Sequence, residues 1–174
     1  SLKAIKGGKV KTSLLVSTYN RPSALKLCLS SILSQSVLPD EIVVADDGSG
    51  APTRAVVVAM QQQSNVPILH VWHEDDGFRL AAIRNKALVQ ASGEYIMQID
   101  GDMLLHKHFV RDHLRFARKG YWLKGNRVML PEKLTHAIEH QGQQLPSGLL
   151  FKKDIGKRKL LLPADFLNPW MVYR

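Results

Sequence analysis

The chain has 174 residues, 45% of them hydrophobic, enough for one domain with a substantial core. Its formal net charge is +9, from 24 lysine and arginine residues against 15 aspartate and glutamate residues. This charge favours an anionic partner such as a nucleotide, an acidic glycan, a lipid headgroup or a nucleic acid. The single cysteine, Cys28, excludes an intramolecular disulfide, and no apolar run is long enough for a membrane span. We therefore expect a cytoplasmic protein, with the inner face of the membrane as the alternative location.

Apolar, β-rich runs alternate with helical patterns between residues 13 and 99. The runs typical of buried strands cover residues 13–17, 41–45, 68–72 and 95–99. Helical patterns lie between them: one begins near Pro22 and carries leucine and isoleucine on one face, and the others cover about residues 52–63 and 80–91. This βαβαβαβ order predicts an α/β fold, a Rossmann-like αβα sandwich with right-handed crossovers and a mostly parallel central sheet.

A polar loop follows each of these strands, at residues 17–21, 46–49, 73–79 and 100–102. Because the carboxyl ends of parallel strands meet at one edge of a sheet, we expect the loops to converge there and to bind a ligand. Separate polar turns explain any one loop, but they explain poorly why acidic residues gather at one end of a basic chain. Neither Gly-x-Gly-x-x-Gly nor Gly-x-x-x-x-Gly-Lys follows the first strand, which disfavours dinucleotide and P-loop sites.

The last loop carries two carboxylates, Asp100 and Asp102, on either side of Gly101. Carboxylates at i and i+2 of an extended segment face the same side, and we expect the glycine to let a bulky anionic ligand approach the backbone. Their hard oxygen atoms suit a divalent cation, so a metal with a diphosphate is the expected occupant. For this motif taken alone, an ordinary Asp-Gly turn is the preferred interpretation, and the other polar loops shift the preference to a metal site.

Several ordered blocks resemble the family 2 glycosyltransferases, which have the GT-A fold. They are STYNRP at 17–22, EIVVADDGS at 41–49, RNKA at 84–87 with ASGEYI at 91–96, and DGD at 100–102. The stretch EDDGFR at 74–79 is similar to bacterial members that assemble polysaccharides and surface glycans. The resemblance covers about residues 13–130, and its blocks are specific because they occur together and in order.

The resemblance implies a nucleotide diphosphate sugar as donor and Mn²⁺ or Mg²⁺ as cofactor. It implies that Asp47 accepts a hydrogen bond from the base, most often uracil, while Ser17 and Tyr19 shape the same pocket. It places Asp100 near the ribose and the metal, and makes Asp102 the residue that binds the metal bridging the two phosphates.

Basic residues near this site have less specific roles. Arg79 and Arg84 stand where the family places cations near the nucleotide, and a guanidinium binds phosphate oxygens in pairs. A solvated helix face is the alternative for each. His106 and His108 follow the metal motif, but a surface position is the preferred interpretation over metal ligation.

Other histidines and the tryptophans are weaker candidates. His70 and His73 rank below His106 and His108 as ligands, and Trp72, on a strand, is expected in the core. Trp122 and Trp170 either stack on a sugar or fill the core.

One departure from the family concerns the catalytic base. Polysaccharide-assembling relatives continue into a Gly-Trp-Gly-Glu-Asp-like block that supplies it, and no such block occurs before Arg174. We therefore expect a natural chain that continues, with a nucleotide-sugar-binding core at 1–130 and a partial, irregular acceptor-side region at 131–174. The basic run 152–159 is expected to be a solvated loop, with a phosphate or membrane-surface contact as the alternative. Four other carboxylate residues lie in no block that resembles the family: Glu132, Glu139, Asp154 and Asp165.

The predicted function is an inverting glycosyltransferase that moves a sugar from a nucleotide diphosphate sugar, most often a UDP-sugar, to a glycan or lipid-linked acceptor. A nucleotidyltransferase is the alternative enzyme, although the glycine-rich loop that it needs after the first strand is missing. A catalytically inactive nucleotide-binding domain is a further alternative. A nucleic-acid-binding module would explain the charge, but acidic loops crowd the binding edge, so we expect no nucleic-acid partner. The sequence leaves the oligomeric state open.

Overall fold

The structure is a computed structural model that describes residues 10–125, 127, 129–141 and 171–173. The chain divides into two compact units, one spanning Gly8–Arg111 and the other containing the residues from Asp112 onward. We describe each unit by itself. The sequence-based boundary at residue 130 lies beyond this division, and the assignment of an acceptor-side region stays a prediction.

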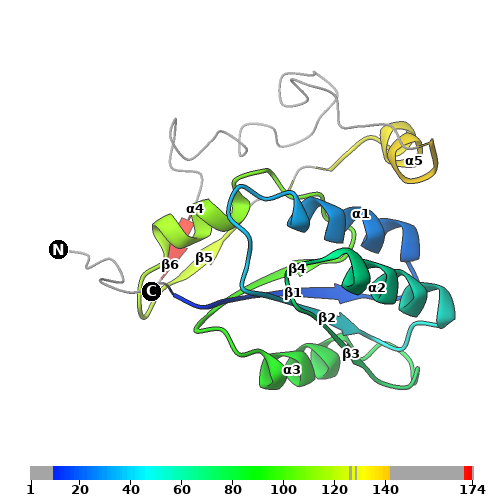
Figure 1. Ribbon diagram of the computed structural model, residues 1–174, viewed down its shortest axis with the longest axis horizontal. Helices are drawn as coiled ribbons and strands as arrows, with labels where there is room; N and C mark the ends of the chain where they lie inside the picture. Colours follow the sequence, from blue (N-terminus) through cyan, green and yellow to red (C-terminus); the bar gives the residue numbers. More distant parts are fainter. Residues whose placement is uncertain (1–9, 126, 128, 142–170, 174) are drawn as a thin grey trace. The chain divides into compact units, whose positions relative to one another are not determined.

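The first unit alternates strands and helices in the predicted order. Its elements are β1 (Thr12–Thr18), α1 (Pro22–Leu33), β2 (Glu41–Asp46), α2 (Ala51–Gln63), β3 (Ile68–Trp72), α3 (Leu80–Gln90) and β4 (Tyr95–Asp100). The four strands form one parallel sheet in the order β3-β2-β1-β4. Figure 1 shows α1 and α2 over one face of this sheet and α3 over the other. The predicted α/β sandwich with a parallel central sheet is confirmed.

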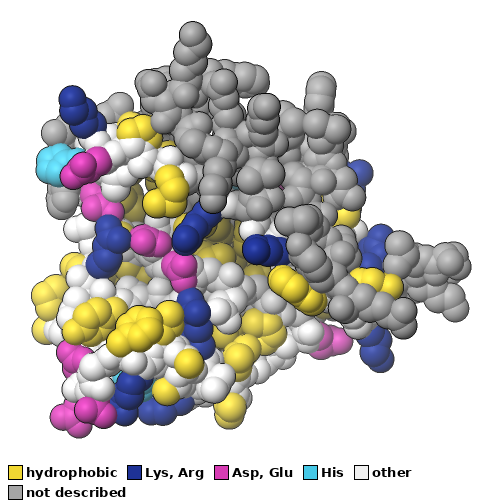
Figure 2. Space-filling view, turned by 180° about the vertical axis from the view of Figure 1, so that it is seen from behind, with side chains coloured by type: hydrophobic (Ala, Val, Ile, Leu, Met, Phe, Trp, Pro, Cys, Tyr) yellow, Lys and Arg dark blue, Asp and Glu magenta, His cyan; other side chains and the backbone are white. Residues whose placement is uncertain are grey.

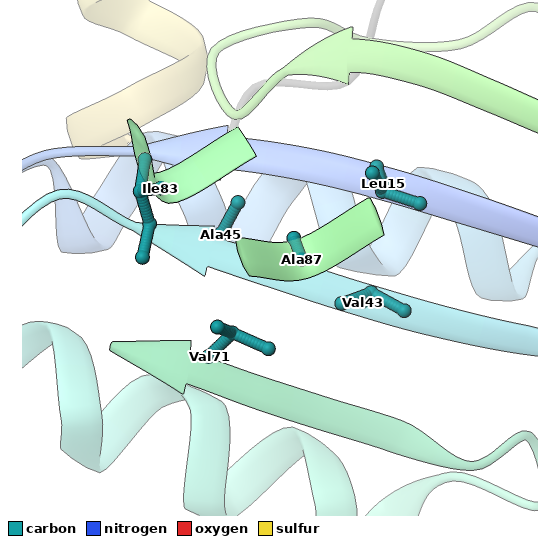
Figure 3. Packing of buried hydrophobic residues seen from close by; sticks show 6 residues of the cluster. All are labelled: Leu15, Val43, Ala45, Val71, Ile83 and Ala87. Carbon is teal, nitrogen blue, oxygen red and sulfur yellow. The ribbon is translucent and has the colours of Figure 1, made fainter. Parts of the chain in front are cut away.

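The core follows the two-residue alternation of strand side chains. Odd-numbered side chains of β1, β2 and β3 pack against α3, where Ile83 and Ala87 lie one helical turn apart (Figure 3). Even-numbered residues of β1 and β2 point to the opposite face, which α1 and α2 cover, and they are fully buried too. Because both faces are covered, these strands are continuous apolar runs. The cluster in Figure 3 consists of Leu15, Val43, Ala45, Val71, Ile83 and Ala87.

The strand register brings the polar loops together at one edge. Ser17, near the end of β1, stands beside Ala45 of β2 on one side and Asp100 of β4 on the other. The pairing continues into the loops, because the Gly101 N–H donates to the Ser17 carbonyl at 2.7 Å and the Asp47 N–H to the Thr18 carbonyl at 3.0 Å. The loops after β2 and β4 are therefore fixed against the end of β1.

The second unit contains short elements that the sequence analysis did not predict. Trp122–Lys124 (β5) pairs antiparallel with Met171–Tyr173 (β6), and α5 covers Glu132–Gln141. Helix α5 begins after Pro131, whose carbonyl accepts hydrogen bonds from the next turn, and it has only Leu134, Ala137 and Ile138 as apolar residues. So short a stripe gives little periodicity. Helix α4 (Phe109–Phe116) lies in the basic sequence between His106 and Arg118. It spans the division between the two units.

A glycine at the start of β4 should be essential to this sheet. A Cβ on Gly93 would lie 2.5 Å from the Ser13 backbone nitrogen and would also meet Ser13 Oγ, so alanine must push β1 and β4 apart. We expect Gly93→Ala to lower the free energy of unfolding by about 1–3 kcal/mol, measured by urea denaturation. Gly50→Ala is the control, because the nearest atom to its added Cβ is 3.8 Å away. Equal losses in the two variants would contradict this account.

Candidate functional site

Polar side chains at the carboxyl edge of the sheet gather on the face that α3 covers. Ser17 and Asp47 continue the odd-numbered side of β1 and β2, which packs against this helix. Asp100 is in register with Ser17 and shares the side of Ile96, which packs against the same cluster. Strand alternation thus directs all three side chains to the N-terminal half of α3.

Ser17, Arg84 and Asp100 form one hydrogen-bonded cluster. The Arg84 guanidinium donates to Ser17 Oγ from Nε at 3.3 Å and from Nη2 at 3.0 Å, and Nη2 also lies 2.7 Å from Asp100 Oδ1. The Ser17 hydroxyl is 3.2 Å from the Ile99 carbonyl and 3.4 Å from Asp100 Oδ1. The three predicted residues are therefore brought together. Arg84 holds Asp100, whose side chain keeps 45% of its surface exposed.

Asp102 lies in the turn after β4 rather than in an extended segment, because the strand ends at Asp100. The expectation that strand alternation places both carboxylates on one side is therefore wrong. Gly101 is also needed for packing within the protein. A Cβ there would lie 2.9 Å from the Ser17 carbonyl, so the glycine lets the turn approach β1. Asp102 Oδ2 is 3.2 Å from Nη1 of Arg21.

The two carboxylates fit a hard divalent cation by their chemistry. Asp100 and Asp102 present oxygen ligands, and both side chains are about half exposed, at 45% and 47%. Among the described residues, no group of three or more His, Cys, Asp or Glu side chains converges as metal ligands. His108 Nδ1 is 2.7 Å from Ser36 Oγ, and the His106 ring packs edge-on against that of His108. Bound phosphate oxygens and water would have to supply the other positions.

Asp47 is a buried anchor for the loop after β3. Its side chain is 4% exposed, and its Oδ1 lies 2.7 Å from Nε2 of the equally buried His73. Its Oδ2 accepts the Arg79 N–H at 3.0 Å, where α3 begins. Lys86 Nζ, a donor, is 3.5 Å from His73 Nδ1, so a ring protonated on Nε2 satisfies both neighbours. Sequence reasoning considered His73 only as a weak metal ligand and did not predict its hydrogen bond to Asp47. Its position one residue after β3, beside the end of β2, was the available signal.

The loop at 73–79 has further attachments. The Tyr19 hydroxyl donates to Asp75 Oδ2 at 2.9 Å, and this bond and the Asp75 charge raise the pKa of Tyr19. Gly48 has φ +98°, and a Cβ there would lie 2.6 Å from the Asp75 Cα, so only glycine fits. Arg79 directs its guanidinium to the Glu74 carbonyl at 2.7 Å and to Asp76 at 3.3 Å. A phosphate contact by Arg79 would require exchange of these bonds.

Asp46 points to the opposite side from Asp47 and supports the loop after β2. It is fully buried; its Oδ1 accepts the Ser49 N–H at 2.8 Å and its Oδ2 lies 2.9 Å from His70 Nε2. Trp72 Nε1 donates to the Ser49 carbonyl at 3.0 Å, and Arg54 lies over its ring. Trp72 is 41% exposed, so the expectation that it lies in the core is wrong. The strand β3 is at the sheet edge, where one side of a side chain stays open to solvent.

Several other candidates belong to the second unit or fall outside the described residues. Glu132 and Glu139 belong to α5 in the second unit, and Trp122 in that unit is 54% exposed. Among the helices of the described residues, none has the length and apolar character of a membrane-spanning segment. The predictions outside the described residues concern Asp154, Asp165, Trp170 and the run 152–159.

Comparison with known proteins identifies the family. Residues 13–163 match the family model described as glycosyl transferase family 2. The chain belongs to this family. Curated relatives of the family 2 chain include the hyaluronan synthase of Pasteurella multocida, 31% identical over 60% of this chain and 11% of the relative. A second is the GalNAc(5)-diNAcBac-PP-undecaprenol beta-1,3-glucosyltransferase of Campylobacter jejuni, 27% identical over 87% of this chain and 48% of the relative. The chain thus spans less than half the length of either relative.

Solved structures share the fold of the family 2 chain. Residues 1–349 of S. aureus TarS, in complex with UDP-GlcNAc, are 30% identical with a TM-score of 0.51, over 61% of this chain and 30% of that one. The mannosyltransferase PcManGT from Pyrobaculum calidifontis has a TM-score of 0.56 at 24% identity, over 63% of this chain and 32% of that one, which shows the fold alone. The GT-A fold expected from the sequence is confirmed.

Asp46 should make stability sensitive to acid. Burial acts to raise the pKa of its carboxyl, but hydrogen bonds from His70 and Ser49 outweigh burial and hold the pKa below its ordinary value. A lowered folded-state pKa adds stability above the ordinary carboxyl pKa of about 3.9, and this contribution declines as the pH falls from there through the lowered pKa. We expect Asp46→Asn to be less stable than wild type at pH 6 and to lose less stability between pH 6 and pH 3, measured by urea denaturation. Equally steep losses would contradict this assignment.

Proposed function

We propose that this chain forms the donor-binding part of an inverting glycosyltransferase that moves a sugar from a UDP-sugar to a glycan or lipid-linked acceptor. The observation that carries the proposal is the Ser17–Arg84–Asp100 cluster, next to Asp102, at the carboxyl edge of a parallel sheet. Membership of glycosyl transferase family 2 supports the reaction class. The complex of TarS with UDP-GlcNAc supports a UDP-sugar as donor.

Asp102 and Asp100 would hold Mn²⁺ or Mg²⁺ at this edge. The bound cation would neutralise negative charge on the departing diphosphate. Arg84 contributes by fixing the orientation of Asp100 through their 2.7 Å contact. Because Arg84 is also bonded to Ser17 at the end of β1, the position of Asp100 depends on the sheet rather than on a free loop.

The donor pocket would be formed by residues around Asp47, Ser17 and Tyr19. Asp47 accepts two hydrogen bonds, and a carboxylate has capacity for about four, so it retains capacity for a bond from the base. Its burial restricts that bond to a ligand seated directly against the end of β2. Tyr19 is 49% exposed, and its link to Asp75 places an aromatic ring at the loops that would border the nucleotide.

The acceptor is inferred from the kinds of relatives that the chain matches. The names of two of them refer to hyaluronan and to an undecaprenol-linked glycan. Inversion by direct displacement requires a base that removes the proton of the acceptor hydroxyl. We assign no residue of the chain to this role. A base supplied from beyond Arg174 stays a prediction, and activity assays of Glu132→Gln and Glu139→Gln variants would test the candidates within α5.

The metal role of Asp102 can be tested by removing its charge. We expect Asp102→Asn to fold normally and to lose Mn²⁺-dependent UDP binding, because the amide keeps the size of the side chain but not the charge that attracts the cation. In wild type, UDP at one hundred times its dissociation constant should add about 2.7 kcal/mol of stability in the presence of Mn²⁺, which a thermal shift detects.

The matched control for Asp102→Asn is Glu94→Gln. It removes the same charge from an exposed residue just before β4, at the other end of the same strand. This variant should keep wild-type binding. Wild-type UDP affinity in Asp102→Asn would remove that residue from the site. A melting shift with duplex DNA and none with any nucleotide would overturn the proposed function.

Base recognition by Asp47 is separable from its anchoring of the loop. If Asp47 binds uracil, Asp47→Ala should reduce the preference for UDP over other nucleoside diphosphates by about tenfold or more, because a buried base edge loses its partner. If Asp47 only holds His73 and the loop, the affinities for all nucleoside diphosphates should fall together. Calorimetric titration with UDP, CDP and GDP in the presence of Mn²⁺ distinguishes the two, and an equal fall would contradict the base contact.

A further inference from the structure

Arg21 stands next to the proposed metal site without any role assigned so far. We propose that Arg21 competes with the divalent cation for Asp102 and, once displaced, binds the diphosphate of the donor. This inference rests on the proposed function, because it assumes that Asp102 is a metal ligand.

The backbone of Arg21 is fixed while its side chain remains accessible. Arg21 immediately precedes α1, and its carbonyl accepts the Leu25 N–H at 3.0 Å as the first bond of that helix. Its side chain makes no hydrogen bond that caps the helix. The guanidinium reaches instead across the edge of the sheet, where Nη1 lies 3.2 Å from Asp102 Oδ2. Arg21 is therefore a tethered cation beside the carboxylate that would hold the metal.

The two arginines at this edge hold their carboxylates in different ways. Arg84 is 27% exposed and is bonded to both Ser17 and Asp100, with a shortest contact of 2.7 Å. Arg21 and Asp102 are 52% and 47% exposed, and Nη1 of Arg21 lies 3.2 Å from Oδ2 of Asp102. Exposed ion pairs of this kind contribute little stability and exchange easily. Arg84 is thus suited to orienting a ligand residue, and Arg21 to releasing one.

A guanidinium and a divalent cation cannot share the same carboxylate oxygen closely, because two positive centres would then be only a few ångströms apart. A cation that binds Oδ2 of Asp102 therefore displaces Arg21. The displaced guanidinium would stay close to Asp102, because the backbone of Arg21 is fixed at the start of α1, and it would therefore be near a diphosphate held by that cation. A planar guanidinium binds phosphate oxygens in pairs, so the donor offers Arg21 a better partner than the one it loses. Figure 2 shows acidic and basic side chains side by side on one face of the molecule.

This exchange predicts effects of opposite sign for Arg21→Gln. Without nucleotide, the variant should bind Mn²⁺ about two- to fivefold more tightly, because the cation no longer displaces an ion pair. At saturating Mn²⁺, it should bind UDP about tenfold more weakly, because the diphosphate loses a charged donor. A residue that only stabilised the loop would weaken both. Arg21→Lys, which keeps the charge, should recover part of the UDP affinity.

The experiment uses the 174-residue chain and two binding measurements. Electron paramagnetic resonance of free Mn²⁺ follows binding of the metal alone, and calorimetry at saturating Mn²⁺ follows UDP. Lys26→Gln, which removes one positive charge from an exposed position on α1, is the matched control and should change neither affinity by more than about twofold.

Each result decides between the two proposals. Tighter Mn²⁺ binding together with weaker UDP binding in Arg21→Gln, absent from Lys26→Gln, supports the exchange. Unchanged or weaker Mn²⁺ binding, or unchanged UDP binding, overturns it. If Asp102→Asn abolishes Mn²⁺-dependent UDP binding in the same series, the proposed function stands even when the exchange fails. If wild type binds no UDP in the presence of Mn²⁺, both proposals fail.

Discussion

The parallel pairing of β1 with β2 on one side and with β4 on the other is the constraint on which the site depends. It places Ser17 beside both Ala45 and Asp100, and the hydrogen bonds of this ladder extend beyond the strands to Gly101 and Asp47. A slip of one residue in either pairing would turn every side chain to the other face of the sheet. Ser17 and Asp100 would then no longer share the side on which Arg84 approaches from α3.

Two adjacent buried aspartates hold the loop after β2 in place by hydrogen bonds on opposite sides of the sheet. Asp46 faces one side of the sheet and bonds to His70 and Ser49, while Asp47 faces the other and bonds to His73 and the start of α3. A buried carboxylate is costly unless each oxygen finds a donor, and here each oxygen of both residues has one. The consecutive aspartates therefore join three segments at the edge of the sheet: the loop itself, β3 and α3.

The charges at this edge are balanced locally although the chain is strongly basic. Arg84 and Arg21 each stand against one carboxylate of the Asp-Gly-Asp motif, one in a partly buried cluster and the other in an exposed pair. The positive charge of each guanidinium offsets part of the repulsion between the two neighbouring carboxylates. This arrangement also places two guanidinium groups, which suit a diphosphate, beside the proposed metal site, so the net charge of +9 is compatible with an acidic motif at the proposed donor site.

The amino-acid sequence by itself determined the first unit to within a residue or two at most element ends. Continuous apolar runs such as Ile42–Ala45 can only be strands covered on both faces, and Pro22 begins a helix whose stripe includes Leu25 and Leu29. Ser17 and Asp100 were also within its reach, because carboxyl ends of parallel strands meet at one edge, whereas Arg84 was predicted from the family resemblance. The short elements of the second unit could not be predicted from the sequence. Helix α5 has too narrow an apolar stripe, and β5 pairs with a segment far along the chain.

Tertiary structure alone decided which residues of the site contact one another. The link between His73 and Asp47 spans 26 positions, that between Arg21 and Asp102 spans 81, and no local pattern encodes contacts over such separations. The purpose of Gly101 likewise became clear only from the Ser17 carbonyl beside it. Periodicity reports which face a side chain takes within its own element, whereas its contacts depend on which elements the sheet register brings next to it.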